Sequence, residues 1–188
     1  HADVDHFNAV PNLLDRFHVG TISITPSMYA QTAPATEALI KAIRAHRIPL
    51  QLVQEGDRLA IDESVELRIL HPPPDEPTQS DNANSVVLEI ATGGFRMLLP
   101  GDLERDGLDE LLSEMPRDYD VVMAPHHGSP NSRPNEFLTW STPKHVIVSS
   151  SKHLDIPKLE DASPASTRFH YTARAGAITI TVHAHDVQ

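Results

Sequence analysis

The chain has 188 residues, which suits one domain of ordinary size with a sizeable core. Charged residues make up 22% and hydrophobic residues 39%, a balance that excludes wholesale disorder and a membrane-embedded protein. The 26 acidic and 15 basic side chains give a net charge of −11, which disfavours stable nucleic-acid binding by this chain alone. Cysteine is absent, so any metal must be held by the 12 histidines and the carboxylates.

Apolar periodicity predicts a mixed succession of helices and strands. Helical spacing predicts helices over residues 8–17, 34–46, 103–115 and 135–140. Alternation predicts strands over residues 19–25, 50–53, 58–61, 65–70, 85–91, 95–99, 120–123, 145–149, 168–172 and 177–182. We expect two β-hairpins, one turning at Thr92-Gly93-Gly94 and one joining the last two strands. The proline-rich stretch 71–77 is expected to be a rigid loop inside a single domain that spans residues 1–188. The fold class is α/β (α+β), with packed sheets and helices outside.

The first candidate site is the opening motif His1-x-Asp3-x-Asp5-His6, which has no strand before it and is typical of a fragment cut from a longer chain. In an extended segment His1, Asp3 and Asp5 point to one side, and a turn into the following helix brings His6 to them. Imidazole together with carboxylate suits Zn²⁺ or Mn²⁺, and four such ligands suit two ions better than one. The alternative is a solvated acidic loop.

The second candidate is Asp102, which follows the apolar strand 95–99 after a flexible Gly101. Its carboxylate can be a metal ligand at a strand end. It can also cap the helix that we expect to begin at Leu103, and one residue can serve both purposes.

The third candidate is Ala124-Pro125-His126-His127-Gly128-Ser129, which also follows an apolar strand. Neighbouring residues of a regular strand face opposite ways, so we expect a bend, with one histidine as ligand and the other as its support or as a proton donor. Gly128 lets backbone N–H groups approach an anion, and Ser129 can donate a hydrogen bond to it. The alternative is a surface histidine pair.

Together with Asp81-Asn82-Ala83-Asn84-Ser85-Val86-Val87-Leu88, these segments resemble the metallo-β-lactamase superfamily, in particular the C-terminal domain of ComEC-type DNA-internalisation competence proteins. The resemblance covers about residues 1–150. It implies an αββα sandwich that lacks its N-terminal strands in this fragment.

The resemblance also implies the roles of the candidate residues. One ion would be held by His1 and Asp3 and the other by Asp5 and His6, with a bridging Asp102 and with His126 or His127 completing a shell. The cofactors would be two divalent ions, Zn²⁺ or Mn²⁺. The expected catalytic residues are Asp5 and His127. Substrate contacts are expected from Asn84, Ser85, Gly128 and Ser129.

The implied function is metal-dependent hydrolysis of a phosphodiester, with DNA as substrate. The chain would be the soluble domain of a larger protein of the cytoplasmic membrane and would face the outside of the cell. Ile156 stands where the competence proteins carry a further histidine, and His153 lies close enough to replace it. Two alternatives stay open: hydrolysis of another ester, lactone or thioester, and a non-catalytic domain that keeps the fold.

Overall fold

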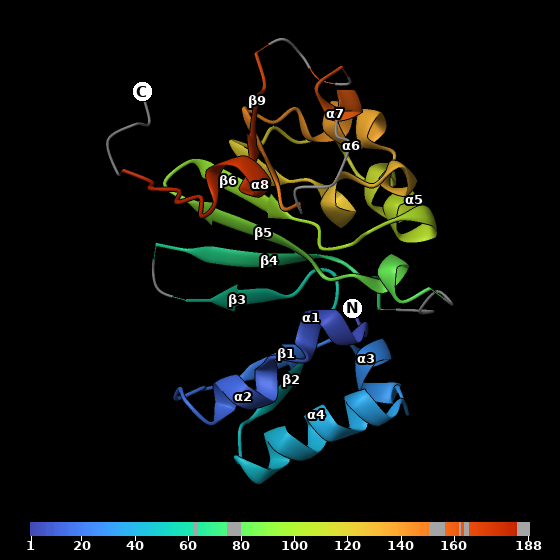
Figure 1. The fold of residues 1–188 in the computed structure, drawn as a ribbon, viewed down its shortest axis with the longest axis vertical. Coiled ribbons are helices and arrows are strands. Elements are labelled where there is room, and N and C mark those ends of the chain that lie inside the picture. The colour runs from blue at the N-terminus through green and yellow to red at the C-terminus, as the bar shows by residue number, and fades with distance from the viewer. Residues whose placement is uncertain (62–63, 75–79, 151–156, 162, 164–165, 184–188) are drawn as a thin grey trace.

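The computed structural model describes residues 1–61, 64–74, 80–150, 157–161, 163 and 166–183. Residues 1–53 form a small α/β unit at one end of the molecule, and the remainder is built around one large sheet (Figure 1). In the described part of the chain, no helix combines the length and the apolar character needed to cross a membrane.

The small unit surrounds a two-stranded parallel sheet, in which Ile22 of β1 lies opposite Leu50 of β2. Its core comes from the apolar faces of the helices and from β1, and consists of Phe7, Leu14, Ile24, Met28, Leu39 and Ile43. The elements are α1 (Val4–Phe7), α2 (Val10–Leu14), β1 (Ile22–Ile24), α3 (Pro26–Ala30), α4 (Pro34–Ala45) and β2 (Leu50–Leu52). The helix predicted over residues 34–46 and both strands are confirmed in place.

Two features of the small unit differ from the sequence prediction. The helix predicted over residues 8–17 is shorter and forms α2 alone, and the separate helix α1 before it was not predicted. The two helices do not join, because Pro11 has no N–H to donate to Phe7 and fits only the first turn of a new helix. The helix α3 was not predicted. The side chain of Thr25 caps it by accepting a hydrogen bond from the backbone N–H of Met28 at 3.1 Å, and Pro26 occupies its first turn.

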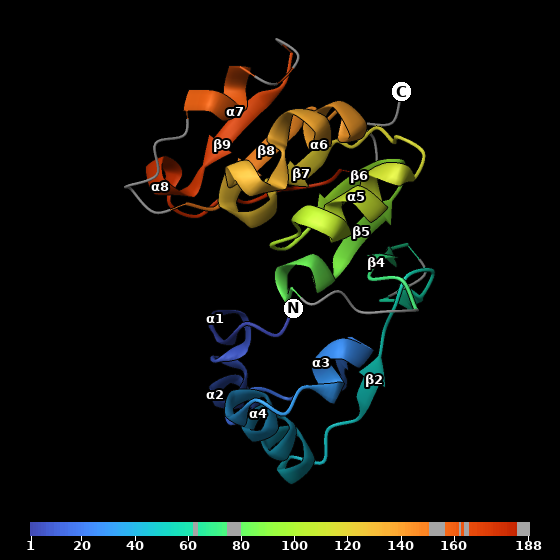
Figure 2. The ribbon, with the colours of Figure 1, turned by 90° about the vertical axis from the view of Figure 1, so that its right-hand side faces the viewer.

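The large sheet has seven strands in chain order, antiparallel from β3 to β6 and parallel from β6 to β9. Its strands are β3 (Arg58–Ala60), β4 (Glu66–His71), β5 (Val87–Thr92), β6 (Phe95–Leu99), β7 (Val121–Met123), β8 (His145–Val148) and β9 (Arg168–Tyr171). The helices α5 (Arg105–Ser113), α6 (Pro134–Ser141) and α7 (Pro157–Asp161) lie on one side of it (Figure 2). The core between sheet and helices includes Val87, Leu98, Leu108, Val122 and Phe137.

Of the two predicted hairpins, one is confirmed. The strands β5 and β6 are joined by Gly93 and Gly94, whose φ angles of 53° and 88° suit a two-residue turn. The hairpin of residues 168–172 with 177–182 is wrong. After β9 the chain enters the helical turn α8 (Thr172–Ala175) instead of a hairpin turn, and the alternating residues 177–182 form no strand.

A histidine pair links the parallel strands β8 and β9. Nδ1 of His145 and Nε2 of His170 are 2.9 Å apart, so one nitrogen donates a hydrogen bond and the other accepts it. Burial, the neighbouring His170 and the charge of Arg168 lower the pKa of His145, against a weaker opposing effect of Asp120. The folded chain therefore holds His145 neutral at pH values where an ordinary histidine is charged.

We expect this pair to make the chain lose stability in mild acid. Below about pH 6.5 the unfolded state binds a proton at His145 that the folded state does not, so the free energy of unfolding falls as the pH falls. Urea unfolding at pH 7.5 and pH 5.5 should show a smaller loss for His145→Gln than for the wild type. An equal loss in both proteins would contradict this role of the pair.

Candidate metal centre

The candidate centre lies where the N-terminal segment meets the carboxyl ends of two neighbouring strands. Because β6 and β7 are parallel, the segments that follow them leave the same edge of the sheet. After β6 the turn at Gly101, with φ of 58°, leads to Asp102. After β7 the chain forms η2 (Pro125–Gly128), which carries His126 and His127.

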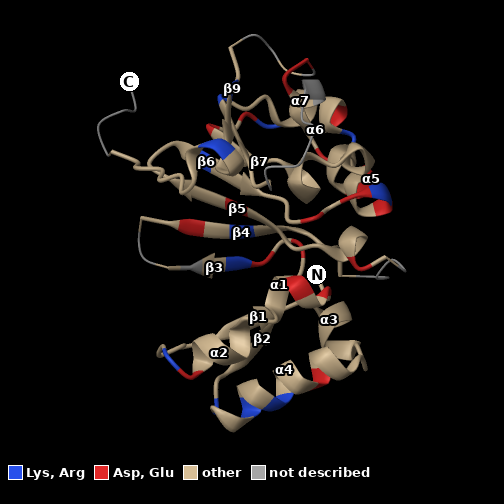
Figure 3. Cartoon of the chain, viewed as in Figure 1, with Lys and Arg blue, Asp and Glu red and all other residues tan. Residues whose placement is uncertain are grey.

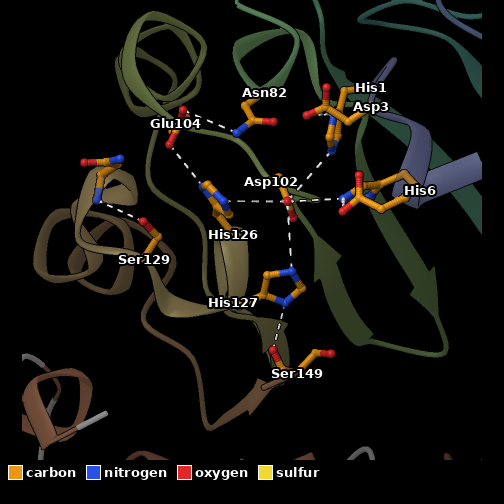
Figure 4. Close-up of polar contacts among 12 residues, drawn as sticks. His1, Asp3, His6, Asn82, Asp102, Glu104, His126, His127, Ser129 and Ser149 are labelled. Atoms are coloured by element: carbon orange, nitrogen blue, oxygen red, sulfur yellow. Dashed lines mark hydrogen bonds and ion pairs between the residues drawn. The ribbon is translucent and has the colours of Figure 1, made fainter. Parts of the chain in front are cut away.

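Four imidazole rings surround the carboxylate of Asp102 (Figure 4). Oδ2 of Asp102 lies 3.2 Å from Nε2 of His6 and 3.9 Å from Nε2 of His1. It also lies 3.9 Å from Nε2 of His126 and 4.0 Å from Nε2 of His127. The side chain of Asp102 is only 11% exposed. Asp102 is therefore the common neighbour of all four histidines.

His1, His6 and Asp102 are close enough together to share one metal ion, since one ligand atom from each lies within 4.8 Å of the others. The ring of His1 is buried, and neither of its nitrogens has a hydrogen-bond partner among the described residues. A buried imidazole without partners is costly, whereas coordination of a cation would satisfy it. Two histidines and one carboxylate are a donor set that suits Zn²⁺ or Mn²⁺. The residues present thus fit a divalent ion.

The bend expected at the histidine pair is present. His126 and His127 both have left-handed backbone conformations, with φ of 46° and 58°, so the two neighbouring rings face the same point. Nδ1 of His126 donates to Oε2 of Glu104 at 3.0 Å, and Nδ1 of His127 donates to the carbonyl oxygen of Ser149 at 2.8 Å. Because both acceptors lack a proton, each hydrogen sits on Nδ1 and each Nε2 is free to bind a cation.

The opening motif is arranged differently from the sequence prediction. The chain is extended only as far as Asp3, and α1 begins at Val4, so Asp5 does not line up with His1 and Asp3. The side chain of Asp5 is 81% exposed and its Oδ2 lies 4.0 Å from Nε2 of His6. Asp3 is about half-exposed and its Oδ2 lies 3.3 Å from Nδ1 of His1. The structure thus brings His1 and His6 together and leaves both aspartates at the rim.

The helix-cap alternative for Asp102 is wrong. The helix α5 begins at Arg105 rather than Leu103, and the residue at its N-cap is Glu104. Asp102 lies outside the helix, in the turn after β6, and faces the histidines. The buried Glu104 was missed by the sequence analysis. The signal that points to it is a second carboxylate two residues after Asp102.

The four residues expected to contact substrate are buried, packed closely or hydrogen-bonded within the chain. Asn84 is buried and its side chain donates to the carbonyl oxygen of Ser80 at 3.0 Å, and Ser85 is fully buried. Gly128 has φ of 87°, and a side chain there would meet Leu159. Ser129 accepts a hydrogen bond from the backbone N–H of Asn131 at 3.3 Å and caps η3 (Pro130–Ser132). Ile156 and His153 lie outside the described residues.

The small unit is fastened beside the centre by a direct side-chain contact. Gln31, at the end of α3, donates from Nε2 to Oδ1 of Asp81 at 2.7 Å. Asp81 precedes η1 (Asn82–Asn84), which lies next to the centre and carries the amide of Asn82 (Figure 4). The contact joins parts of the chain that are 50 residues apart and links the small unit to the segment beside the centre.

The chain is similar in sequence to known proteins. The chain is 32% identical over 154 residues, or 81% of its length, to ComE operon protein 3 of Bacillus subtilis (strain 168). The chain is a metallo-β-lactamase-like relative of the ComEC-type competence proteins. A second ComEC-type relative, competence protein ComA of Neisseria gonorrhoeae, is 31% identical over 80 residues, or 42% of this chain. The chain spans 19% and 12% of the length of these two relatives.

A solved structure also shares the fold of this ComEC-related chain. It comes from Parabacteroides distasonis and is assigned to the metal-dependent hydrolases; the TM-score is 0.51 at 14% identity, over 85% of this chain and 79% of that one. At this identity the likeness concerns the fold alone. No family model matches the chain.

Proposed function

We propose that this chain is a metal-dependent hydrolase domain that holds two divalent ions, Zn²⁺ or Mn²⁺, and cleaves phosphodiesters. The observation that carries the proposal is the convergence of four imidazole nitrogens on the buried carboxylate of Asp102, together with the buried ring of His1, which makes no hydrogen bond among the described residues. Divalent ions in such a site stabilise negative charge on phosphoryl oxygens and make hydroxide available near neutral pH.

The ligands proposed for the two ions lie on either side of Asp102. His1 and His6 would hold one ion together with Asp102, because the ligand atoms of these three residues already lie close together. His126 would approach the other from the opposite side of the same carboxylate. Asp3 and Asp5 stay in the proposal as rim carboxylates that complete the coordination.

The chain's own residues supply the proton transfer. The ring of His127 is half-exposed, and its Nδ1 is held by Ser149, so its protonated form presents Nε2–H toward the centre. We assign His127 the donation of a proton to the leaving oxygen and Asp5 a place at the reacting group. Gly128 and Ser129 follow directly and are proposed to contact the substrate together with Asn84 and Ser85.

DNA is the proposed substrate because the relatives are competence proteins. The charge of this chain does not favour DNA by itself: acidic segments lie in α1 and in the loop leading into α5, near the centre, whereas the basic residues of α4 lie at the far end (Figure 3). We therefore propose that the rest of a longer, membrane-embedded protein presents the DNA, with this domain on the outer side of the membrane.

The same charge distribution favours a second candidate, the hydrolysis of a smaller ester, lactone or thioester. A metal centre of this kind serves any of these reactions, and the surrounding loops choose the substrate. A net charge of −11 opposes a polyanion far more than a small neutral ester.

We also propose that the large sheet is one layer of an αββα sandwich. Apolar residues of β5 and β6 occupy both faces: Val87 and Leu98 are buried under the helices, and Leu88 and Leu99 pair on the opposite face, where they are half-buried. A sheet that is apolar on both faces needs a layer on each. The second layer of the proposed sandwich would include β1 and β2, which form only a two-stranded sheet, and would need further strands.

The test of the proposed function is metal content together with turnover. The chain would be equilibrated with Mn²⁺ or Zn²⁺, its bound metal measured, and cleavage of linear DNA and of a small phosphodiester and carboxylic ester assayed. We expect about two ions per chain and DNA cleavage. His6→Asn should remove at least one ion and the activity. The matched control is His46→Asn, since His46 pairs with Asp15 on the far side of the small unit.

Each result decides between the candidates. Bound metal with ester turnover and intact DNA would establish the second candidate. Bound metal without turnover of any substrate would show a non-catalytic domain. A chain that binds no metal at all would overturn the proposal.

A further inference from the structure

We infer that Glu104 is a positioning residue that fixes the ring of His126, so that Nε2 of His126 always faces the metal centre. The inference rests on the proposed function and assigns a role to a side chain that lies outside the ligand set. Oε2 of Glu104 accepts the Nδ1 hydrogen of His126 at 3.0 Å, on the side of the ring away from Asp102 (Figure 4).

The burial of Glu104 indicates a specific purpose. Its side chain is only 7% exposed, and burying a carboxylate is costly unless its oxygens are satisfied. Both oxygens have partners: besides His126, Oε1 accepts from Nδ2 of Asn82 at 3.3 Å and lies 3.5 Å from Nε of Arg105. Asn82, on η1, therefore holds Glu104 in the orientation that serves His126.

Glu104 does not cap the helix that it precedes. It is the N-cap residue of α5, where a side chain ordinarily accepts a hydrogen bond from the first free N–H groups of the helix. Its side chain makes no such bond and contacts His126 instead. The side chain at this N-cap position thus orients the imidazole of His126 rather than capping α5.

The neighbouring His127 shows the contrast. Its Nδ1 bonds to a neutral main-chain carbonyl, that of Ser149, and its ring is more exposed than that of His126. A hydrogen bond to a carboxylate is stronger than one to a neutral carbonyl, and it increases the basicity of the opposite ring nitrogen. His126 is therefore the more firmly oriented ring of the pair.

The test compares Glu104→Gln with the wild type, using the metal-free chain first. Long-range ¹H–¹⁵N spectra of the histidine rings at pH 8 report which nitrogen carries the hydrogen. We expect the Nδ1–H form alone for His126 in the wild type and a mixture of both forms in Glu104→Gln. Mn²⁺ or Zn²⁺ affinity should fall about 10- to 100-fold in the variant, as when other supports of ligating histidines are removed.

The control is Glu114→Gln, which neutralises an exposed carboxylate just past the other end of α5 and should change neither readout. Urea unfolding of all three proteins shows whether they are equally folded, and Glu104→Asp offers a second variant that keeps the charge. An unchanged His126 tautomer in Glu104→Gln would overturn the inference even if the wild type binds metal. Conversely, a wild type that binds no metal but shows the tautomer change would overturn the proposed function alone.

Discussion

Replacing Asp102 by asparagine is expected to abolish binding of divalent ions. Four imidazole nitrogens lie within 4.0 Å of one oxygen of this carboxylate, so both proposed ion positions depend on it. The amide has nearly the same shape but no negative charge. Removing a mere support of a ligand weakens metal binding about 10- to 100-fold, and loss of the shared ligand itself should exceed the upper figure.

The measurement is isothermal titration of the metal-free variant and wild type with Mn²⁺ and Zn²⁺. Asp106→Asn is the matched control, because Asp106 is an exposed carboxylate four residues further along the chain. Circular dichroism of the metal-free proteins checks that both variants fold. If Asp102→Asn bound the ions within a few-fold of the wild-type affinity, the charge of the central carboxylate would not be needed to hold them.

Replacing Gly107 by alanine is expected to destabilise the chain by about 3 kcal/mol, the upper end of the usual cost of overpacking. In an exposed helix the same change stabilises by about 1 kcal/mol, because alanine favours helix. Here α5 packs directly on η1, and a Cβ on Gly107 would lie 2.1 Å from the carbonyl oxygen of Ala83. That oxygen belongs to the backbone, so the helix and the turn must separate.

Urea unfolding would measure the effect, with Gly20→Ala as the control, because a Cβ at Gly20 meets nothing within 4 Å. We also expect weaker metal binding by Gly107→Ala. Separation of α5 from η1 would pull Asn82 away from Glu104, and Glu104 orients His126. A Gly107→Ala variant at least as stable as the wild type would show that α5 and η1 can move apart without loss of free energy of unfolding.

The sequence by itself determined where the strands, the main helices and the chemically important side chains lie along the chain. Alternation over residues 85–91 and 95–99 predicted β5 and β6, and helical spacing predicted α4, α5 and α6 to within a few residues. Polar residues placed directly after apolar strands predicted Asp102 and the histidine pair as candidate site residues. These features follow from the local chain, whose periods of 2 and 3.6 residues can be recognised without knowing any distant contact.

The tertiary structure decided which of those side chains face one another. Nothing in the spacing of the opening motif shows that α1 begins at Val4 and turns Asp5 into solvent while His1 and His6 meet at Asp102. The role proposed for Glu104 depends on His126, which is 22 residues away, and the second hairpin fails because a helical turn stands where its turn was expected. Such outcomes come from packing and hydrogen bonds between distant segments, which no local pattern encodes.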